Sequence, residues 1–123
     1  MCDLYHSYGL KVIFHSDGDI TAIVPDLIAA GVDAIGPVDV PAGMDLAALK
    51  AGFGSQLTFV GGIDLGILAA GTVEDVRRAT RRALVDAGAG GGFVLGSSSE
   101  ELYDSLPMEN ILAMWEVAHE SKY

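Results

Sequence analysis

Three polar residues whose side chains could do chemistry, His15, Asp17 and Asp19, directly follow an apolar run at residues 11–14. If that run is a strand that continues for two more residues, His15 and Asp17 point to the same side of the chain, because side chains alternate along a strand. An imidazole and a carboxylate at this spacing are suited to hold a divalent metal or to act as an acid–base pair. We therefore treat His15 and Asp17 as candidate catalytic residues and candidate metal ligands, and we expect Asp19 to cap a following helix.

Three more polar segments follow apolar runs in the same way: 36–39 (GPVD), 61–64 (GGID) and 96–101 (GSSSEE). The segments that lead into the apolar runs are rich in glycine and carry little chemistry, which favours a functional role for the polar segments. Aspartates in such positions either serve a site or cap the next helix; for Asp17, Asp39 and Asp64 we favour the site. We assign a catalytic role to Asp64. The candidate substrate-binding residues are Asp39, Gly61, Gly62, Ser97, Ser98 and Ser99.

The elements that must position these residues are four short strands alternating with helices. We expect strands at about 11–14, 33–37, 57–61 and 92–96. Each is solidly apolar rather than alternating, which is typical of strands in a parallel sheet that is covered on both faces.

The helices between the strands have recognisable ends. We expect one from Ile20 to Gly31, one over 46–53 capped by Asp45, and one that ends at Gly88. The last of these begins with the segment TVED, in which Thr72 and Asp75 are placed to form a capping box. We expect a final helix after Pro107, and its proposed packing side consists of Ile111, Leu112, Met114, Trp115 and Ala118.

Four consecutive strand–helix units in a single domain, residues 1–123, predict an α/β fold with parallel strands. Two architectures fit: half of a TIM (β/α)8 barrel, or a flavodoxin-like doubly wound sheet. The second needs a fifth strand, for which residues 1–10 are short and polar. In both architectures ligands bind at the carboxyl ends of the strands, where the candidate residues lie.

Composition and charge bear on the class of partner and on the cellular location. The formal net charge of −10 argues against nucleic acid, and the arginines of the segment RRATRR (77–82) fall on the outer side of a predicted helix. No apolar run is long enough for a membrane span, and the single cysteine, Cys2, allows no disulfide within the chain. We expect a cytoplasmic protein with no membrane partner.

Several motifs in order resemble one known family. They are HSDGDI (15–20), IVPDLIAAGVDAIGPV (23–38), AGMDLAALKAGFG (42–54), LTFVGGID (57–64), GTVEDVRRA (71–79), GGGFVLGSS (90–98) and PMENILAMWEV (107–117). Together they resemble the carboxyl-terminal half of the uroporphyrinogen decarboxylase family, whose superfamily includes the cobalamin-dependent methyltransferases. The resemblance implies strands five to eight of a barrel, and it covers nearly the whole chain.

The same resemblance implies chemistry. In the methyltransferase branch a His-x-Cys motif and a later cysteine bind zinc that activates a thiol. His15 matches that histidine, Asp17 stands where the first cysteine would be, and Ser97, Ser98 and Ser99 stand near the place of the second. A divalent metal on His15 and Asp17 would need a third ligand, for which Asp39, Asp64 and Glu100 are the candidates.

Two classes of function follow from these observations. The first is an enzyme that transfers a methyl group from a corrinoid or decarboxylates a tetrapyrrole-like acid. We favour methyl transfer because the acidic residues at the strand ends would repel the carboxylates of a tetrapyrrole-like substrate. The second is an inactive half-barrel fragment. Because open parallel strand edges associate, we expect such a chain to form a homodimer through those edges.

Overall fold

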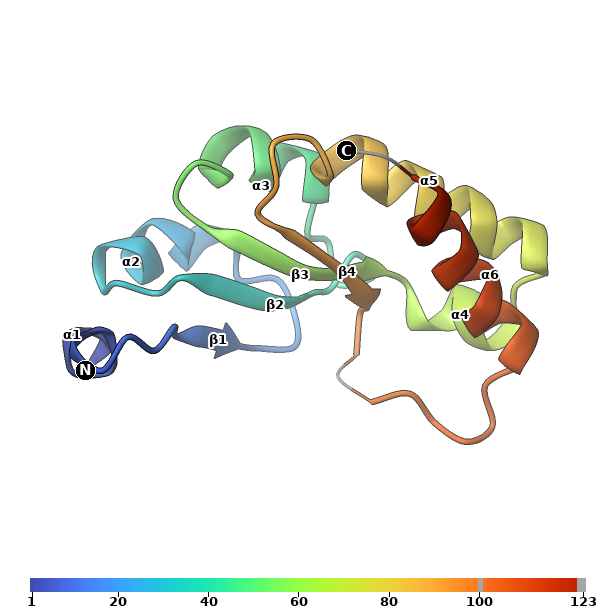
Figure 1. The fold of residues 1–123 in the computed structure, drawn as a ribbon, viewed down its shortest axis with the longest axis horizontal. Helices are drawn as coiled ribbons and strands as arrows, with labels where there is room; N and C mark the ends of the chain where they lie inside the picture. The colour runs from blue at the N-terminus through green and yellow to red at the C-terminus, as the bar shows by residue number, and fades with distance from the viewer. Residues whose placement is uncertain (100, 122–123) are drawn as a thin grey trace.

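The computed structural model describes residues 1–99 and 101–121, in which helices and strands alternate along the chain (Figure 1). The elements are, in order, α1 (Cys2–Ser7), β1 (Ile13–His15), the 3-10 helix η1 (Thr21–Ile23), α2 (Val24–Ala29), β2 (Ala34–Val38), α3 (Leu46–Phe53), β3 (Thr58–Ile63), α4 (Leu65–Ala70), α5 (Val73–Ala87), β4 (Phe93–Ser97) and α6 (Met108–Glu120). None of the helices within these residues has both the length and the hydropathy that a membrane crossing requires.

The four strands form one parallel sheet in the order β1-β2-β3-β4, which confirms the predicted α/β fold. Each strand begins one or two residues later than expected and ends one or two residues later. Strand order that follows chain order, with no reversal, is the arrangement of a (β/α) barrel, because right-handed crossovers then place all helices on one face. A doubly wound sheet reverses its order at a switch point, so the flavodoxin-like alternative is wrong.

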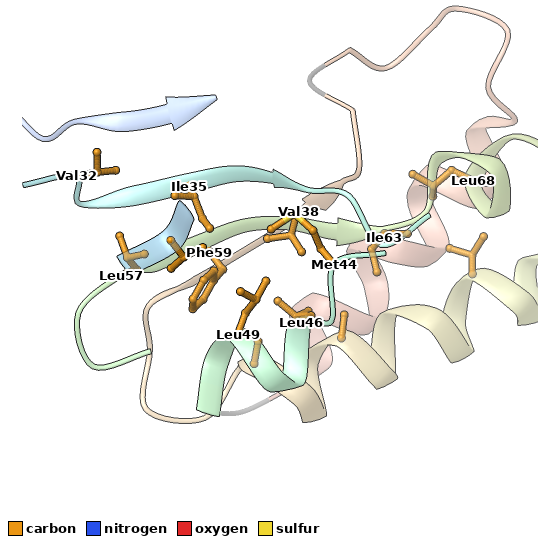
Figure 2. Packing of buried hydrophobic residues seen from close by; sticks show 14 of the residues in the cluster. Val32, Ile35, Val38, Met44, Leu46, Leu49, Leu57, Phe59, Ile63 and Leu68 are labelled. Carbon is orange, nitrogen blue, oxygen red and sulfur yellow. The ribbon is translucent and has the colours of Figure 1, made fainter. Parts of the chain in front are cut away.

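The hydrophobic core lies between the sheet and the helix layer (Figure 2). Ile35, Phe59 and Ile63 are fully buried on the covered face of the sheet. They belong to one cluster with Val24 of α2, Leu49 of α3 and several other helix side chains. A fully buried side chain of this size contributes roughly 1.5–3 kcal/mol relative to an exposed one.

Within residues 1–99 and 101–121 no helix covers the opposite face of the sheet (Figure 1), so the prediction that every strand is covered on both faces is wrong. Ile13 of β1 is 63% exposed and Val94 of β4 is 53% exposed. Only β2 is buried along its whole length, because it lies between two strands and presents small residues such as Ala34 and Gly36. We call the face without helices the open face.

The expected helix from Ile20 to Gly31 is divided into η1 and α2. Pro25 lies in the first turn of α2, and because a proline has no N–H to donate to a preceding turn, the α-helix starts only at Val24. Asp19 accepts a hydrogen bond of 2.9 Å from the N–H of Thr21, the first residue of η1, but the N-cap position is Ile20, one residue after the predicted one. This hydrogen bonding with Thr21 also lowers the pKa of Asp19.

The remaining caps largely match the sequence, with one helix that the sequence analysis missed. Asp45 caps α3 by accepting from the N–H of Ala48, and the capping box of Thr72 and Asp75 is formed at the start of α5. The additional helix is α4, which Asp64 caps by accepting a 2.7 Å hydrogen bond from the N–H of Gly66. It was missed because six residues are too few to show a helical period.

The packing side of helix α6 matches the expected one only in part: Ile111 and Met114 pack against the core as expected, but the most buried side chains are others. Its buried residues are Asn110, Ala113 and Val117, whereas Leu112 and Trp115 are 50% and 60% exposed. Asn110 donates to the carbonyls of Leu68 and Gly71, both at 2.9 Å, which ties α6 to α4. The prediction chose the most apolar stripe, but close helix packing here uses a stripe of smaller residues and a buried amide.

Candidate functional site

The polar segments singled out in the sequence all follow the carboxyl ends of the strands. Because the four strands are parallel and adjacent, these ends gather at one edge of the sheet. His15 ends β1, Asp39 follows β2, Asp64 follows β3 and Ser97 ends β4. The arrangement that the sequence predicts for the candidate residues is therefore present at the level of the backbone.

His15 and Asp17 are neighbours at the end of β1. The His15 Nε2 and Asp17 Oδ2 atoms are 3.7 Å apart, and the two side chains are 42% and 77% exposed. Ile13 and His15 share a side of β1, and their register partners on β2 are Ala34 and Gly36. His15 therefore stands on the open face, with a carboxylate close enough to stabilise a positive charge on its imidazole.

A hollow on the open face lies next to this pair. It has a volume of about 630 Å³, within the range of about 300–1,000 Å³ typical of small-molecule sites. Its lining includes Gly36, Gly96, Ser97 and Ser99 at the strand ends. His15 is paired in register with Gly36, which lines this hollow, but the His15 side chain is not itself part of the lining.

The serines after β4 connect the last two strands. The Ser98 hydroxyl oxygen accepts from the N–H of Leu65 at 3.1 Å, and its own N–H donates to the carbonyl of Ile63. Ser97 accepts from the N–H of Ser99 at 3.0 Å, which holds the turn after the strand. Ser97 and Ser98 are both buried, so their hydroxyls already serve the fold, whereas Ser99 is half-buried and lines the hollow.

Asp64 and Gly62 lie at a different surface from His15. Asp64 caps α4, and both residues line a hollow of about 390 Å³ between α3, α4 and α5. That hollow also contains Asp45, Asp86 and Arg82. The structure thus divides the candidates into a group on the open face and a group on the helix side, a division that strand-end position alone did not reveal.

Asp39 and Gly61 have clear backbone roles. The Asp39 carbonyl accepts from the N–H groups of Ala42 and Met44 in the turn after β2. Gly61 has a φ of +112°, and a Cβ there would lie 2.9 Å from the backbone nitrogen of Val38. Glycine is therefore needed at position 61 for close strand packing as well as for the left-handed backbone.

The described residues do not complete a metal site. No group of three or more His, Cys, Asp or Glu side chains within residues 1–99 and 101–121 is placed to hold an ion. His15 and Asp17 offer two donors, and the candidate third ligand Glu100 lies outside the described residues.

Most of the lining of the open-face hollow was not identified in the sequence, including two residues that lie outside the strands and the polar segments after them. Leu102, in the connection between β4 and α6, and Met114 of α6 contribute apolar walls. Nothing in their spacing pointed to a site, because their position depends on how the connection crosses the end of the sheet.

The amino end of the sheet carries its own polar network. Asp33 accepts from Lys11 Nζ at 2.8 Å, from the N–H of Val12 at 2.9 Å, and lies 2.7 Å from His6 Nε2. These contacts, led by the one from Lys11, hold the pKa of Asp33 well below its usual range. The acidic partner of His6 thus lies 27 residues away in the sequence, on the other side of β1.

The arginine row on α5 is engaged by carboxylates. Arg77 pairs with Glu116, and Arg82 pairs with Asp86, a contact that raises the pKa of Arg82. Arg78 and Arg81 pair with Asp75 and Glu74. This pattern agrees with a solvated helix face. The expectation that nucleic acid is not a partner stays a prediction.

Fold and site together define four consecutive units of a (β/α)8 barrel with polar strand ends at one edge. The sequence profile of the uroporphyrinogen decarboxylase (URO-D) family matches residues 1–121, and the chain belongs to that family. A methyltransferase from Methanosarcina mazei has a similar structure, with a TM-score of 0.74 and 20% sequence identity. The likeness covers 97% of this chain and 34% of that chain, and it shows the fold alone. No curated protein matches the chain in sequence.

Proposed function

We propose that the open face is one wall of a methyltransferase active site in which His15 and Asp17 act at the reacting centre. The observation that carries the proposal is the placement of this pair, 3.7 Å apart, at the end of β1, where the register partner of His15, Gly36, lines a hollow of about 630 Å³. Membership of the URO-D family and the fold shared with a methyltransferase support it.

The charges at the strand ends favour methyl transfer over decarboxylation of a tetrapyrrole-like acid. The segments 15–19, 36–39, 61–64 and 96–99 contain aspartates and His15 but no lysine or arginine. A substrate with several carboxylates would be repelled by such a rim, since like charges within about 4–6 Å disfavour each other. A neutral thiol as methyl acceptor avoids that repulsion.

The proposed reaction takes a methyl group from a methylated corrinoid to a thiol. The new S–C bond forms as the Co–C bond breaks, and the electron pair of that bond stays on cobalt. The thiol proton passes to the imidazole of His15, so that the attacking species is the thiolate. Asp17 stabilises the resulting imidazolium, while Ser99, which lines the open-face hollow, positions the substrate.

The test uses the whole chain with methylcobalamin and a panel of small thiols, following loss of the methylated corrinoid by its visible absorbance. We expect His15→Gln to lower kcat/KM by about 10²–10⁴-fold, the usual contribution of a general base. Asp17→Asn should cause a smaller loss, because water screens an exposed carboxylate.

The matched control is His6→Gln, which changes the same residue type on α1 and retains a donor for Asp33. It should leave the rate unchanged. Absence of any demethylation by the unmodified chain, or an equal loss in His6→Gln, would refute the proposal. Release of CO₂ from a tetrapyrrole acid without methyl transfer would replace it with decarboxylation.

A further inference from the structure

Large apolar side chains that are exposed on this chain concentrate at the two ends of the sheet. At the β1 end we define the N-terminal flank as Leu4, Tyr5, Tyr8, Leu10 and Ile13, which are 45–76% exposed. At the β4 end we define the C-terminal flank as Val94, Leu102, Tyr103, Met108, Leu112 and Trp115, which are 49–63% exposed. Apart from Met1, the exposed large apolar side chains outside the two flanks are, among the described residues, Ile23, Val40 and Val85.

Each flank also contains a strand with one open edge. Within the described residues, β1 pairs only with β2, and β4 pairs only with β3. Both strands run in the same direction. The open edge of β4 can therefore pair with β1 of another chain and extend the parallel sheet. Open edges of this kind are templates for pairing with another chain.

We propose that a second copy of this chain closes the sheet, with β4 of each copy lying parallel to β1 of the other. A two-fold axis generates the same contact twice and yields a ring of eight parallel strands with no free edge. Every contact then joins an N-terminal flank to a C-terminal flank. The open faces line the interior of the ring, which places the strand ends of both copies around one shared site.

The surface area of the chain suits this assembly. The chain exposes 7083 Å², whereas a compact monomer of 12.8 kDa exposes about 6,300 Å². The excess of about 800 Å² equals what one partner buries in a standard interface. Two chains merged into one compact body would expose about 10,400 Å² and bury about 3,800 Å² in total, which is in the range of obligate dimers.

Electrostatic repulsion opposes the contact between two copies, and it makes dimerisation depend on the salt concentration. Each chain carries a formal net charge of −10, and the C-terminal flank is bordered by Glu101, Asp104 and Glu109. The N-terminal flank offers the ammonium group of Lys11, which is 78% exposed. Repulsion between two such chains is screened by salt, so dimerisation should strengthen as ionic strength rises.

The first experiment measures the mass of the purified chain by sedimentation equilibrium from 1 to 100 µM. We expect a species of twice 12.8 kDa. Ile13→Lys on the N-terminal flank and Val94→Lys on the C-terminal flank should each weaken dimerisation at least tenfold. The matched control is Val85→Lys on α5, where Val85 is 72% exposed and outside both flanks; dimerisation should change less than twofold.

The second experiment mixes the two flank variants. One of the two contacts in the mixed dimer then carries both lysines, while the other carries neither, so the mixture should associate more tightly than either variant alone. A face-to-face dimer, in which each flank meets its own copy, would show no such recovery. Circular dichroism of each variant verifies that it is folded; if one is not, Leu10→Lys replaces Ile13→Lys and Leu112→Lys replaces Val94→Lys.

Several results would overturn the proposal. They are a single-copy mass at 100 µM, equal weakening by Val85→Lys, open polymers that grow with concentration, and dimerisation only after a chain of different sequence is added. The proposal is independent of methyl transfer, because mass and activity are separate readouts.

Discussion

The two faces of the sheet place similar residues in opposite environments. Ile35 on β2 is fully buried under the helices, whereas Ile13 on the neighbouring strand is 63% exposed on the open face. Along β4, Phe93 packs against the core while the next residue, Val94, is 53% exposed. The apolar character of a strand therefore does not decide its burial; the placement of every crossover on one side of the sheet does.

This difference assigns separate tasks to the two faces. The covered face contains the core and accounts for stability, and its polar groups, such as Asn110, are hydrogen-bonded. The open face presents His15, Asp17 and a glycine-lined hollow near the strand ends. Changes on the first face should affect folding, and changes on the second should affect ligand binding or association.

The sharpest comparison is between two isoleucines. We expect Ile35→Ala to lower the free energy of unfolding by about 2–5 kcal/mol, because it removes a fully buried side chain and leaves a cavity. Ile13→Ala, measured at 1 µM, should cost less than about 0.5 kcal/mol, as is usual for exposed positions. Urea unfolding followed by circular dichroism measures both.

Protein concentration makes this comparison more informative. If a second copy covers the open face, the cost of Ile13→Ala should increase at 100 µM, while the cost of Ile35→Ala changes little. Equal costs for the two substitutions at 1 µM would contradict the assignment of tasks to the two faces.

A second comparison uses two glycines. An added Cβ at Gly36 would lie 2.8 Å from the Cβ of Val60, whereas at Gly96 the nearest atom is 3.7 Å away. Gly36→Ala should therefore destabilise by about 1–3 kcal/mol through overpacking, and Gly96→Ala should be nearly neutral. Differential scanning calorimetry of both variants checks the order. A stable Gly36→Ala would mean that β2 and β3 can move apart.

Much of the fold was predictable because its signals are local. Apolar runs bounded by glycine placed the four strands to within two residues, and short polar residues at helix starts gave the caps at Asp45 and Thr72. The burial of α6 was not predictable in this way. Its buried side includes Asn110, whose partners are carbonyls about forty residues away in sequence.

The candidate site was predictable in part for a related reason. Parallel strands bring their carboxyl ends to one edge, so positions after strands could be grouped, and the spacing of His15 and Asp17 placed them together. The sequence did not indicate on which face of the sheet each candidate side chain lies. Asp64 turned toward the helices because it caps α4, a helix too short to be recognised in the sequence.

The smallest expected effect concerns the helix layer that covers one face. Asp75 Oδ2 accepts from the Thr72 hydroxyl at 2.6 Å and from its N–H at 2.9 Å, while the Asp75 N–H donates to the Thr72 hydroxyl at 3.2 Å. These bonds, led by the one from the Thr72 side chain and assisted by Arg78, lower the pKa of Asp75 to about 2. Thr72→Ala should cost about 1 kcal/mol at pH 7, the usual loss of an N-cap.

The pH dependence of the stability lost in Thr72→Ala tests whether the Asp75 carboxylate contributes to the cap. A carboxyl whose pKa falls from 3.8 to about 2 on folding adds stability that is complete above 3.8 and disappears as the pH falls through 2. The difference in stability between the unmodified chain and Thr72→Ala should therefore narrow between pH 4 and pH 2, while Thr72→Ser, which keeps the hydroxyl, should show little difference at any pH. A gap that stays constant in acid would show that the cap acts through helix geometry alone, without the Asp75 carboxylate.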